Sequence, residues 1–478
     1  MVSASLTGLL VSGAGLFAVS TVGLLIPGSI FAYPHSIAAS EPLTVLYGFE
    51  GGWLFVLAVF VLLCVCFVLA LRAAAALRSR RASLGATAIA IALIALFVAI
   101  YPSSSQDLFH NIASARTLWL YGENPLVTPP AAHPDDPLVL QVRAWREVSS
   151  FYGPLFYGLS VIPSRLAGDD VLRNLLAFKA LNGLALLALA ILAGEAAEIL
   201  APGRRTEALV MVGWNPLLLY EAVANGHNDV LMMAAAVVGL LVATKGGRLA
   251  GVAMAGLSTA VKYSSAPLAP VVWIWSWKSG SRRRRFALAT VAVGAVALGF
   301  GLALSFAGLI DAGRDAAVTR QPVRSLVALL DYGLQPVLGG GSLSAARVVC
   351  WAAFLIAFAV SVKRLDGSAQ SLFHTSFWVM AALTLLTVRQ IYPSYLIWFV
   401  CLGAILTGTT AWEVALLASL SGLLSNAVFT EWATWSAADD VMFMVAFVGL
   451  PVAHVVVRRW LLFRKFGHTS PESGDAVL

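Results

Sequence analysis

The sequence has little charge for its length. Only 12% of its 478 residues are Asp, Glu, Lys or Arg, whereas a typical soluble domain has roughly a quarter. Because 59% of the residues are hydrophobic, this shortage excludes a soluble enzyme as well as a disordered or fibrous chain. The apolar residues fall in many blocks long enough to cross a bilayer. The sequence therefore predicts an all-α polytopic membrane protein.

Cysteine is also scarce. Cys64, Cys66, Cys350 and Cys401 all lie inside apolar blocks, with no CxxC or Cys/His spacing, so neither a disulfide framework nor a zinc site is supported. There is also no P-loop and no GxGxxG motif before a strand, which fits a protein that binds no nucleotide. We expect no metal and no cofactor.

The basic residues indicate topology rather than nucleic-acid binding. The net charge of +7 comes from short Lys and Arg clusters between apolar blocks, for example Arg78 to Arg81 and Arg282 to Arg285. Such clusters lie in the cytoplasm. This rule, with a retained first helix near residues 6–27, predicts about fourteen crossings in the plasma membrane and both termini in the cytoplasm.

The same pattern divides the chain into segments. The apolar stretch from Tyr152 to Pro163 is too short to cross, because about twelve helical residues span only about half of a ~30 Å hydrocarbon core; we expect an interfacial helix on the outer face. The expected segments are N-terminal spans (1–101), an external loop with interfacial helices (102–171), a transmembrane core (172–310), a second external loop (311–345), C-terminal spans (346–467) and a disordered tail (468–478).

Asp107 is the first candidate for chemistry. It follows a spanning block by about six residues, at the outer membrane surface, and a carboxylate fixed there can deprotonate an acceptor hydroxyl. The alternative is that Asp107 caps a surface helix, with Ser104 and Ser105 as competing caps. In the same loop Arg116, with Arg143 and Arg146, is either a phosphate or substrate contact or a solvated charge.

A second candidate group lies at an outer turn between two spans. Glu221, His227, Asn228 and Asp229 are costly residues to place beside a membrane, and such residues are functional suspects by default. The alternative is that the last three cap the next helix. A metal site would need further ligands that the sequence does not place nearby.

Lys262 splits an apolar segment into two short pieces. A lysine there needs an anionic partner or a water-filled cavity, unless it reaches out to the interface. Arg389, Tyr392 and Tyr395 stand at the external start of a later helix, where the aromatic residues are either substrate contacts or membrane-belt anchors. Three arginines of the second external loop form another possible phosphate patch: Arg314, Arg320 and Arg324.

Five segments together resemble a known family. They are SQDLFHNIASARTLWLYGENPL, YGPLFYGLS, WNPLLLYEAVANGHNDVLM, VKYSSAPLAP and QIYPSYLIW. In this order and spacing they resemble the polyprenyl-phosphate-mannose-dependent mannosyltransferases of the GT-C superfamily. The resemblance implies a GT-C-like bundle in which Asp107 is the catalytic base and Lys262 and Arg389 lie near the lipid phosphate. The departures from the family pattern are Phe109, His110 and Ser394.

The function that this resemblance implies is sugar transfer on the external face. The donor would be a polyprenyl-phosphate sugar, most simply mannose, and the acceptor a cell-envelope glycolipid or glycan. One inverting displacement needs one base and stabilisation of the departing phosphate. The alternatives are another carrier-linked sugar on the same fold, or a transporter or lipid flippase. Midplane charges and short external loops would favour the transporter, whereas here the candidate charges lie outside.

Overall fold

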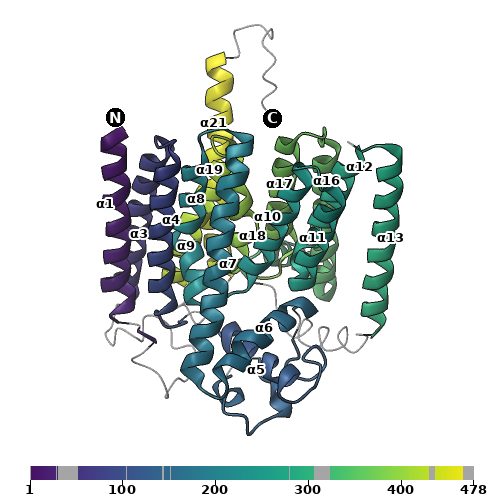
Figure 1. The fold of residues 1–478 in the computed structure, drawn as a ribbon. Helices are drawn as coiled ribbons and strands as arrows, with labels where there is room; N and C mark the ends of the chain where they lie inside the picture. The colour runs from purple at the N-terminus through teal and green to yellow at the C-terminus, as the bar shows by residue number, and fades with distance from the viewer. Residues whose placement is uncertain are drawn as a thin grey trace.

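The computed structural model describes residues 2–27, 29–30, 52–103, 105–142, 145–150, 152–278, 280–305, 323–429 and 437–466. Within these ranges the chain is helical, with one isolated β-bridge between Ser29 and Ile100 and no β-strand. Most of the helices run side by side in one bundle (Figure 1). The prediction of an all-α polytopic membrane protein is confirmed.

Seven helices of the described residues are long and apolar enough to cross a membrane, or up to eight if a bent pair is one span. They are Ala4–Leu25 (α1 with its π-helical end η1), Gly52–Ala75 (α3), Arg80–Val98 (α4), Val171–Leu200 (α7), Leu326–Lys363 (α15 to α16), Ala369–Thr387 (α17) and Thr410–Val428 (in α19, Thr410–Phe429). Shorter apolar helices lie beside them, so the count of about fourteen crossings stays a prediction.

The remaining elements complete the bundle and its loops. They are α5 (Asp107–Trp119), η3 (Pro130–Ala132), η4 (Val139–Gln141), α6 (Pro154–Ala167), α8 (Arg205–Gly213), α9 (Pro216–Leu218), η5 (Leu219–Ala224), α10 (Asp229–Thr244), α11 (Arg248–Val261), η6 (Tyr263–Ser265), α12 (Leu268–Lys278), α13 (Arg282–Ser305), α15 (Leu326–Leu338), η7 (Gly339–Gly341), α16 (Ser342–Lys363), η8 (Pro393–Leu396), α18 (Ile397–Ile405), α20 (Ala437–Met444), η9 (Val445–Gly449) and α21 (Leu450–Phe466).

Helix α3 shows why these segments suit a membrane. Phe60 and Phe67 point into the bundle and are fully buried, whereas Leu62 and Leu69 on other faces are about half exposed. A helix that is apolar all round is stable in lipid but not in water. The exposed apolar side chains therefore mark the lipid-facing surface.

Small residues bring two helices close together beside the candidate site. A Cβ on Gly239 of α10 would lie 2.9 Å from the carbonyl oxygen of Gly251 in α11, and a Cβ on Gly251 would lie 2.7 Å from that of Gly239. Such contact needs residues without side chains, as is common between membrane helices. This packing sets the distance between the start of α10, which carries Asp229, and the end of α11, which precedes Lys262.

Two breaks interrupt the helices where the sequence places its polar residues. Helices α11 and α12 are separated by Lys262 and the short η6, as the Lys-Tyr-Ser-Ser run and Pro267 predict. The pair formed by Arg205–Ala224 and α10 bends by 119°. Asn215 caps the start of α9, where its Oδ1 accepts from the Leu217 amide at 3.0 Å. Broken helices in a membrane line cavities or pack inside protein.

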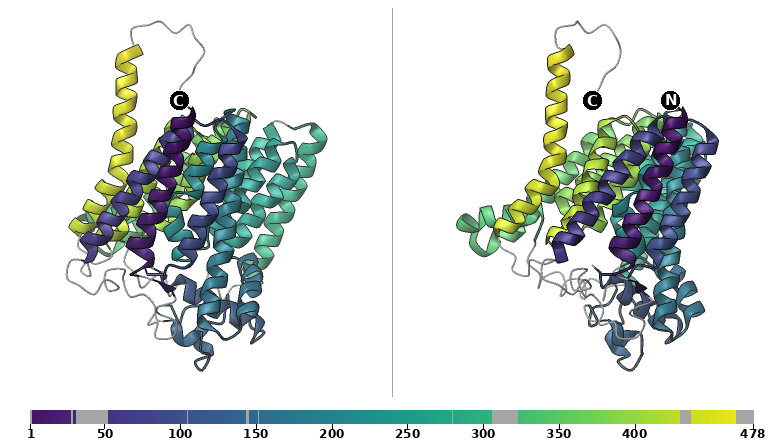
Figure 2. Two further views of the ribbon diagram at one scale, coloured as in Figure 1. Left: turned by 60° about the vertical axis from the view of Figure 1, so that its left-hand side comes forward. Right: turned by 90° about the vertical axis from the view of Figure 1, so that its left-hand side faces the viewer.

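The segment predicted to be external, residues 102–171 and called the external segment below, forms a small unit at one end of the bundle (Figure 1). Helices α5 and α6 lie there, while the start of α1 and the end of α21 lie at the opposite end (Figures 1 and 2). Phe109 and Ile112 of α5 pack with Val139 and with Phe178 of α7 in a hydrophobic cluster of their own. The short stretch after Tyr152 forms the helix α6, whose Phe156 and Tyr157 are buried in the hydrophobic cluster of the bundle itself.

Parts of the predicted segmentation fall outside the described residues. These are the boundary at 310/311 and the tail 468–478. In the second predicted external loop, α15 and η7 lead directly into α16, and α15 packs against α16 through Val327 and Ala346. The segment boundaries stay predictions.

Candidate active site

Asp107 is the first residue of α5, and its carboxylate is held by a tyrosine. The Tyr152 hydroxyl donates to Asp107 Oδ2 at 2.9 Å. The backbone amide of Asp107 is taken by Ser105, whose Oγ accepts at 3.1 Å, while the N-cap position belongs to Gln106. In the described residues the Asp107 carboxylate is therefore oriented by a side chain from the far end of the same external segment.

Lys262 has the anionic partner that its position requires. Its ammonium lies 2.7 Å from Asp229 Oδ1, and the two side chains are 12% and 0% exposed. The indole Nε1 of Trp398 donates to the same carboxylate oxygen. A buried lysine is stabilised by such a pair and does not need to reach the interface. Asp229, which follows the break before α10, is thus bound both by Lys262 from the break between α11 and α12 and by Trp398 from α18.

Aromatic rings surround the Lys262 ammonium. Its Nζ lies 5.0 Å from the ring centre of Tyr152, 5.5 Å from that of Tyr395 and 5.9 Å from that of Trp398. These are cation–π distances. Tyr395 also stacks on Trp398 with ring centres 4.7 Å apart, and Tyr392 meets Tyr395 edge to face at 5.5 Å.

Tyr152 joins Asp107 to Lys262. Its hydroxyl binds Asp107 while its ring faces Lys262, and the neighbouring Gly153 amide donates to the Val261 carbonyl at 3.0 Å. Burial raises the pKa of Tyr152 well above its usual value, so the phenol keeps its proton and stays a donor. We call Asp107, Tyr152, Lys262, Asp229 and Trp398 the central cluster.

Glu221 and His227 form a second network beside the central cluster. Glu221 Oε2 lies 3.1 Å from His227 Nδ1, and Asn426 of α19 donates from Nδ2 to Glu221 Oε1 at 2.6 Å. The described residues contain no group of three or more His, Cys, Asp and Glu side chains that could hold a metal ion. This network fixes the turn before α10.

Gly226 sets the shape of that turn. Its φ of +76° is a conformation that favours glycine, and a Cβ there would lie 2.8 Å from Leu108 Cδ1. The turn therefore packs directly against the first turn of α5, and Asn228 and Asp229 follow it next to the helix that carries Asp107.

Arg389 lies in the loop that leads to Tyr392 and Tyr395. Its carbonyl accepts from the Val323 amide at 3.1 Å and from Ser325 Oγ at 2.8 Å. Burial, followed by the nearby charge of Arg347, lowers the pKa of Arg389. Arg389 thus lies just before the aromatic residues in the chain, and close enough to the guanidinium of Arg347 to be affected by its charge.

Arg116 is engaged inside the external segment rather than with the central cluster. Its Nε lies 2.7 Å from Asp136 Oδ2, its Nη2 lies 2.7 Å from Asp169 Oδ1, and its Nη1 donates to the Gly168 carbonyl at 3.1 Å. Arg146 donates to the Pro134 carbonyl at 3.3 Å. Of the other predicted loop arginines, Arg143, Arg314 and Arg320 lie outside the described residues, whereas the backbone amide of Arg324 donates to Asp440 Oδ1 at 2.6 Å.

We expect Arg116→Ala to destabilise the external segment by about 3–5 kcal/mol, because it leaves the buried Asp136 carboxylate without its cation. Limited proteolysis of the segment measures this loss. Arg173→Ala is the matched control: Arg173 is 75% exposed and lies 3.9 Å from Asp170, so its removal should cost less than about 1 kcal/mol. Equal protease resistance of the two variants would contradict a structural role for Arg116.

His110 ties α5 to the residues before Tyr152. Its Nε2 donates to the Val148 carbonyl at 2.9 Å, and burial lowers the pKa of the imidazole, against smaller opposing effects of that bond and of Asp107. The unfolded chain therefore binds a proton at a higher pH than the folded chain does, so folding stability falls as pH drops below about 6.5. The family departures at Phe109 and His110 thus lie in the core of the external segment.

The resulting prediction concerns acid sensitivity. Protease resistance of the external segment should fall between pH 7.5 and pH 5.5 in the wild type, and His110→Gln should flatten this dependence because glutamine has no such titration. Rates of cleavage across the pH series, corrected for the protease's own profile, measure the effect. An unchanged pH slope in the variant would rule out His110 as its source.

Two residues of these networks are new relative to the sequence prediction. Tyr152 is the first residue of the YGPLFYGLS segment, so the family motif included this tyrosine but the sequence alone assigned it no function. Asn426 lies within an apolar helix, 205 residues from Glu221, and only its polarity in that setting could have marked it.

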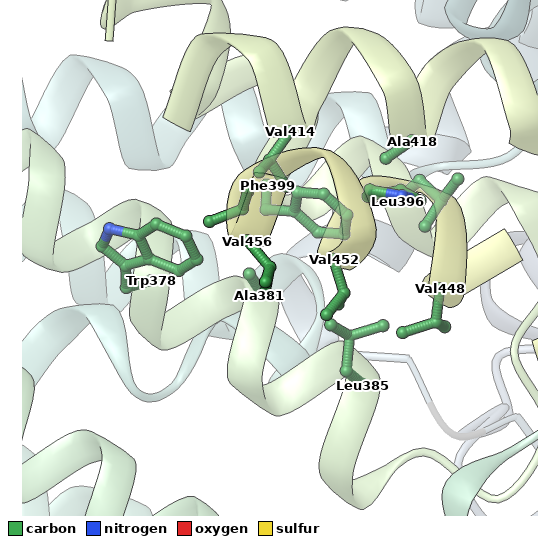
Figure 3. Close-up of a pocket in the computed structure, with 12 residues that line it drawn as sticks. Trp378, Ala381, Leu385, Leu396, Phe399, Val414, Ala418, Val448, Val452 and Val456 are labelled. Atoms are coloured by element: carbon green, nitrogen blue, oxygen red, sulfur yellow. The ribbon is translucent and has the colours of Figure 1, made fainter. Parts of the chain in front are cut away.

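An apolar groove of the described residues lies away from the central cluster. It has a volume of about 160 Å³ and is lined by α17, α18, α19 and α21, with Phe399, Ala418 and Val452 among its residues (Figure 3). Leu396 and Phe399, which line it, flank the Tyr395 and Trp398 of the candidate site. The groove offers no ionisable side chain, so it is not a place for proton transfer.

A family match covers the first part of the chain, and two curated relatives match about a third of it. Residues 10–278 match the family described as "Alpha-(1->6)-mannopyranosyltransferase, N-terminal domain". The chain is 28% identical over 189 residues to alpha-(1->6)-mannopyranosyltransferase A of Corynebacterium glutamicum, which is 38% of this chain and 37% of that protein. It is 27% identical over 176 residues to the protein of the same name from Mycobacterium tuberculosis, 36% of this chain and 33% of that protein. The chain thus matches about a third of the length of these curated relatives, and no solved structure matches it.

Proposed function

The chain belongs to the alpha-(1->6)-mannopyranosyltransferase family, and from this membership we propose that it is an integral membrane mannosyltransferase. The proposed donor is a polyprenyl-phosphate-mannose, the proposed acceptor is a cell-envelope glycolipid or glycan, and transfer takes place on the external face of the plasma membrane. The fold is then of the GT-C type, and the enzyme inverts the anomeric centre.

The observation that supports this proposal most is the central cluster. It joins one carboxylate, Asp107, to a buried ammonium, Lys262, through Tyr152. Four of its five residues lie within the part of the chain that matches the family. Sugar transfer from a phosphate carrier needs a base for the acceptor and a cation for the leaving group. The cluster supplies both at the end of the bundle that bears α5 and α6.

The reaction is a single displacement. The acceptor hydroxyl oxygen attacks the anomeric carbon and forms the new C–O bond, while the bond from that carbon to the phosphate oxygen breaks and its electron pair leaves with polyprenyl phosphate. The hydroxyl proton passes to Asp107. Because the Tyr152 hydroxyl occupies Oδ2, we assign the proton to Oδ1.

Positive side chains stabilise the leaving phosphate. An ammonium has three N–H donors, so Lys262 keeps donors for the phosphate while it binds Asp229 at 2.7 Å. Arg389 is the second proposed phosphate contact, and Tyr392 and Tyr395 supply aromatic faces for the substrate. Glu221 and His227 hold the turn that shapes the site, and Arg116 acts through the folding of the external segment.

The proposed topology places both termini in the cytoplasm. The start of α1 and the end of α21 lie at the end of the bundle opposite α5 and α6 (Figures 1 and 2), and the basic clusters follow the positive-inside pattern. The proposed partners are the polyprenyl-phosphate sugar donor, the glycolipid or glycan acceptor and the membrane lipids, with no nucleic acid.

The test is incubation of membranes that contain the protein with radiolabelled polyprenyl-phosphate-mannose. We expect label in glycolipid or glycan fractions and none in membranes without the protein. A parallel series with other carrier-linked sugars tests the sugar. Movement of intact donor across vesicles without any transfer of label would favour the transporter or flippase and overturn the proposal.

A further inference from the structure

Asn228 is a buried amide whose side chain makes no hydrogen bond to the part of the chain that the structure describes. It is 2% exposed, and neither its Nδ2 nor its Oδ1 has a hydrogen-bond partner among the described residues. Asp229 Oδ2 is likewise buried and without such a partner, because Lys262 and Trp398 both bind Oδ1. Buried polar atoms in native proteins nearly always have partners, so these three atoms require an explanation.

Capping does not explain Asn228. It occupies the N-cap position of α10, but its side chain makes no cap hydrogen bond. Asn215, in the same bent pair of helices, does cap its helix through Oδ1. An asparagine before a helix is expected to cap it, and Asn215 does so whereas the side chain of Asn228 does not.

The position of Asn228 places its amide beside the proposed reaction. The turn that precedes it packs on Leu108, next to Asp107, and the residue that follows it pairs with Lys262. On α5, Asn111 lies four residues after Asp107, on the same side of the helix. It is 1% exposed, and its Oδ1 has no partner within the described ranges. Buried polar atoms without a partner among the described residues therefore lie both on α5, at Asn111, and at the start of α10, at Asn228 and Asp229.

The three atoms of Asn228 and Asp229 fit hydroxyls better than phosphate. They are one donor, Nδ2, and two acceptors, Oδ1 and the carboxylate oxygen Oδ2. A phosphate offers acceptors and negative charge, which two oxygen acceptors repel. A pair of adjacent hydroxyls satisfies all three atoms: one accepts from Nδ2 and donates to Oδ2 of Asp229, and the other donates to Oδ1 of Asn228.

We propose that Asn228 and the Oδ2 atom of Asp229 bind two adjacent hydroxyls of the transferred sugar and thereby select it. The proposal rests on the proposed function, since it assigns this subsite to the sugar of the carrier-linked donor. A site built to bind hydroxyls rejects analogues that lack one, because its buried polar atoms then stay unpaired. Asn228 is thus a specificity-determining residue, while Asp107 carries the proton transfer.

The test compares donors that lack single hydroxyls. kcat/KM is measured for polyprenyl-phosphate-mannose and for its 2-deoxy, 3-deoxy and 4-deoxy analogues. We expect the wild type to reject the analogues at two adjacent positions by about 100-fold or more. In Asn228→Leu, which keeps the size of the side chain, the preference at one or both of these positions should shrink to about threefold, because the hydroxyl has lost its partner.

Thermal unfolding in detergent separates this role from a structural one. Asn228→Leu should leave the unfolding temperature unchanged or raise it, because the removed amide has no partner inside the described protein. Asn215→Leu, the matched control, should lower it, because the cap of α9 is lost. Equal destabilisation by the two substitutions would overturn the proposal.

The kinetic outcomes distinguish this proposal from the proposed function. If the wild type transfers mannose but Asn228→Leu keeps the wild-type ratios between mannose and its deoxy analogues, only the present inference is overturned. The same holds if the wild type accepts all three analogues as well as mannose. If the wild type transfers no carrier-linked sugar at all, the proposed function fails and the assignment of this subsite fails with it.

Discussion

Replacing Asp107 by Asn should lower kcat for sugar transfer by about 10²–10⁴-fold, the usual contribution of general base catalysis. The amide keeps the shape of the carboxylate, and its carbonyl oxygen can still accept from Tyr152, which donates to Asp107 at 2.9 Å. It cannot take up the proton of the acceptor hydroxyl. The measurement is transfer of labelled mannose by membranes that hold equal amounts of wild type and variant.

Asp135→Asn is the matched control for Asp107→Asn. Asp135 is an exposed carboxylate of the same external segment, so the substitution makes the same change of charge without touching the central cluster. It should retain nearly full activity. Transfer by Asp107→Asn within about threefold of the wild type would show that another group takes the proton.

The second large effect is expected at the buried ion pair. Lys262→Met should destabilise the protein by about 3–5 kcal/mol, because it leaves the Asp229 carboxylate buried without its cation; the Asp229 side chain is 0% exposed. Sugar transfer should be lost as well, since the leaving phosphate loses its proposed ammonium. Thermal unfolding and transfer are measured on the same detergent-solubilised samples.

A double variant separates the two losses. In Lys262→Met with Asp229→Asn, no charge is left unpaired, so most of the stability should return, whereas transfer should stay lost. Lys245→Met, an exposed lysine at the other end of α10, should change stability by no more than about 0.5 kcal/mol. A double variant with wild-type transfer would exclude a role for Lys262 in donor use.

The sequence was most informative where charge meets apolar surroundings. Asp107, Asp229 and Lys262 were candidates because ionisable residues are costly beside or inside a membrane, and the structure brings these three together through Tyr152. Lys262 was predicted to need an anionic partner or a water-filled cavity unless it reaches the interface, and in the structure Asp229 is its partner at 2.7 Å. The helix break at Lys262 also lies where the polar run and Pro267 indicate.

Pairings between distant segments could not be predicted in the same way. Nothing in the local pattern joins Arg116 to Asp136 and Asp169, or Glu221 to Asn426, because these contacts depend on how helices pack in three dimensions. The same limit applies to Asp107. Its two interpretations, base and helix cap, differ in the direction of its side chain, and the bond from Tyr152 fixes that direction only in the folded protein.

The bond between Tyr152 and Asp107 closes residues 107–152 of the external segment into a loop. The far end of this loop is also fixed to the bundle, because the Gly153 amide donates to the Val261 carbonyl. A loop whose ends are fixed in this way tolerates changes of length, since each doubling costs only about 0.6 kcal/mol of closure entropy. Residues between the two anchors that take no part in the buried contacts of His110 and Arg116 can therefore change in number while the proposed base, Asp107, keeps its orientation.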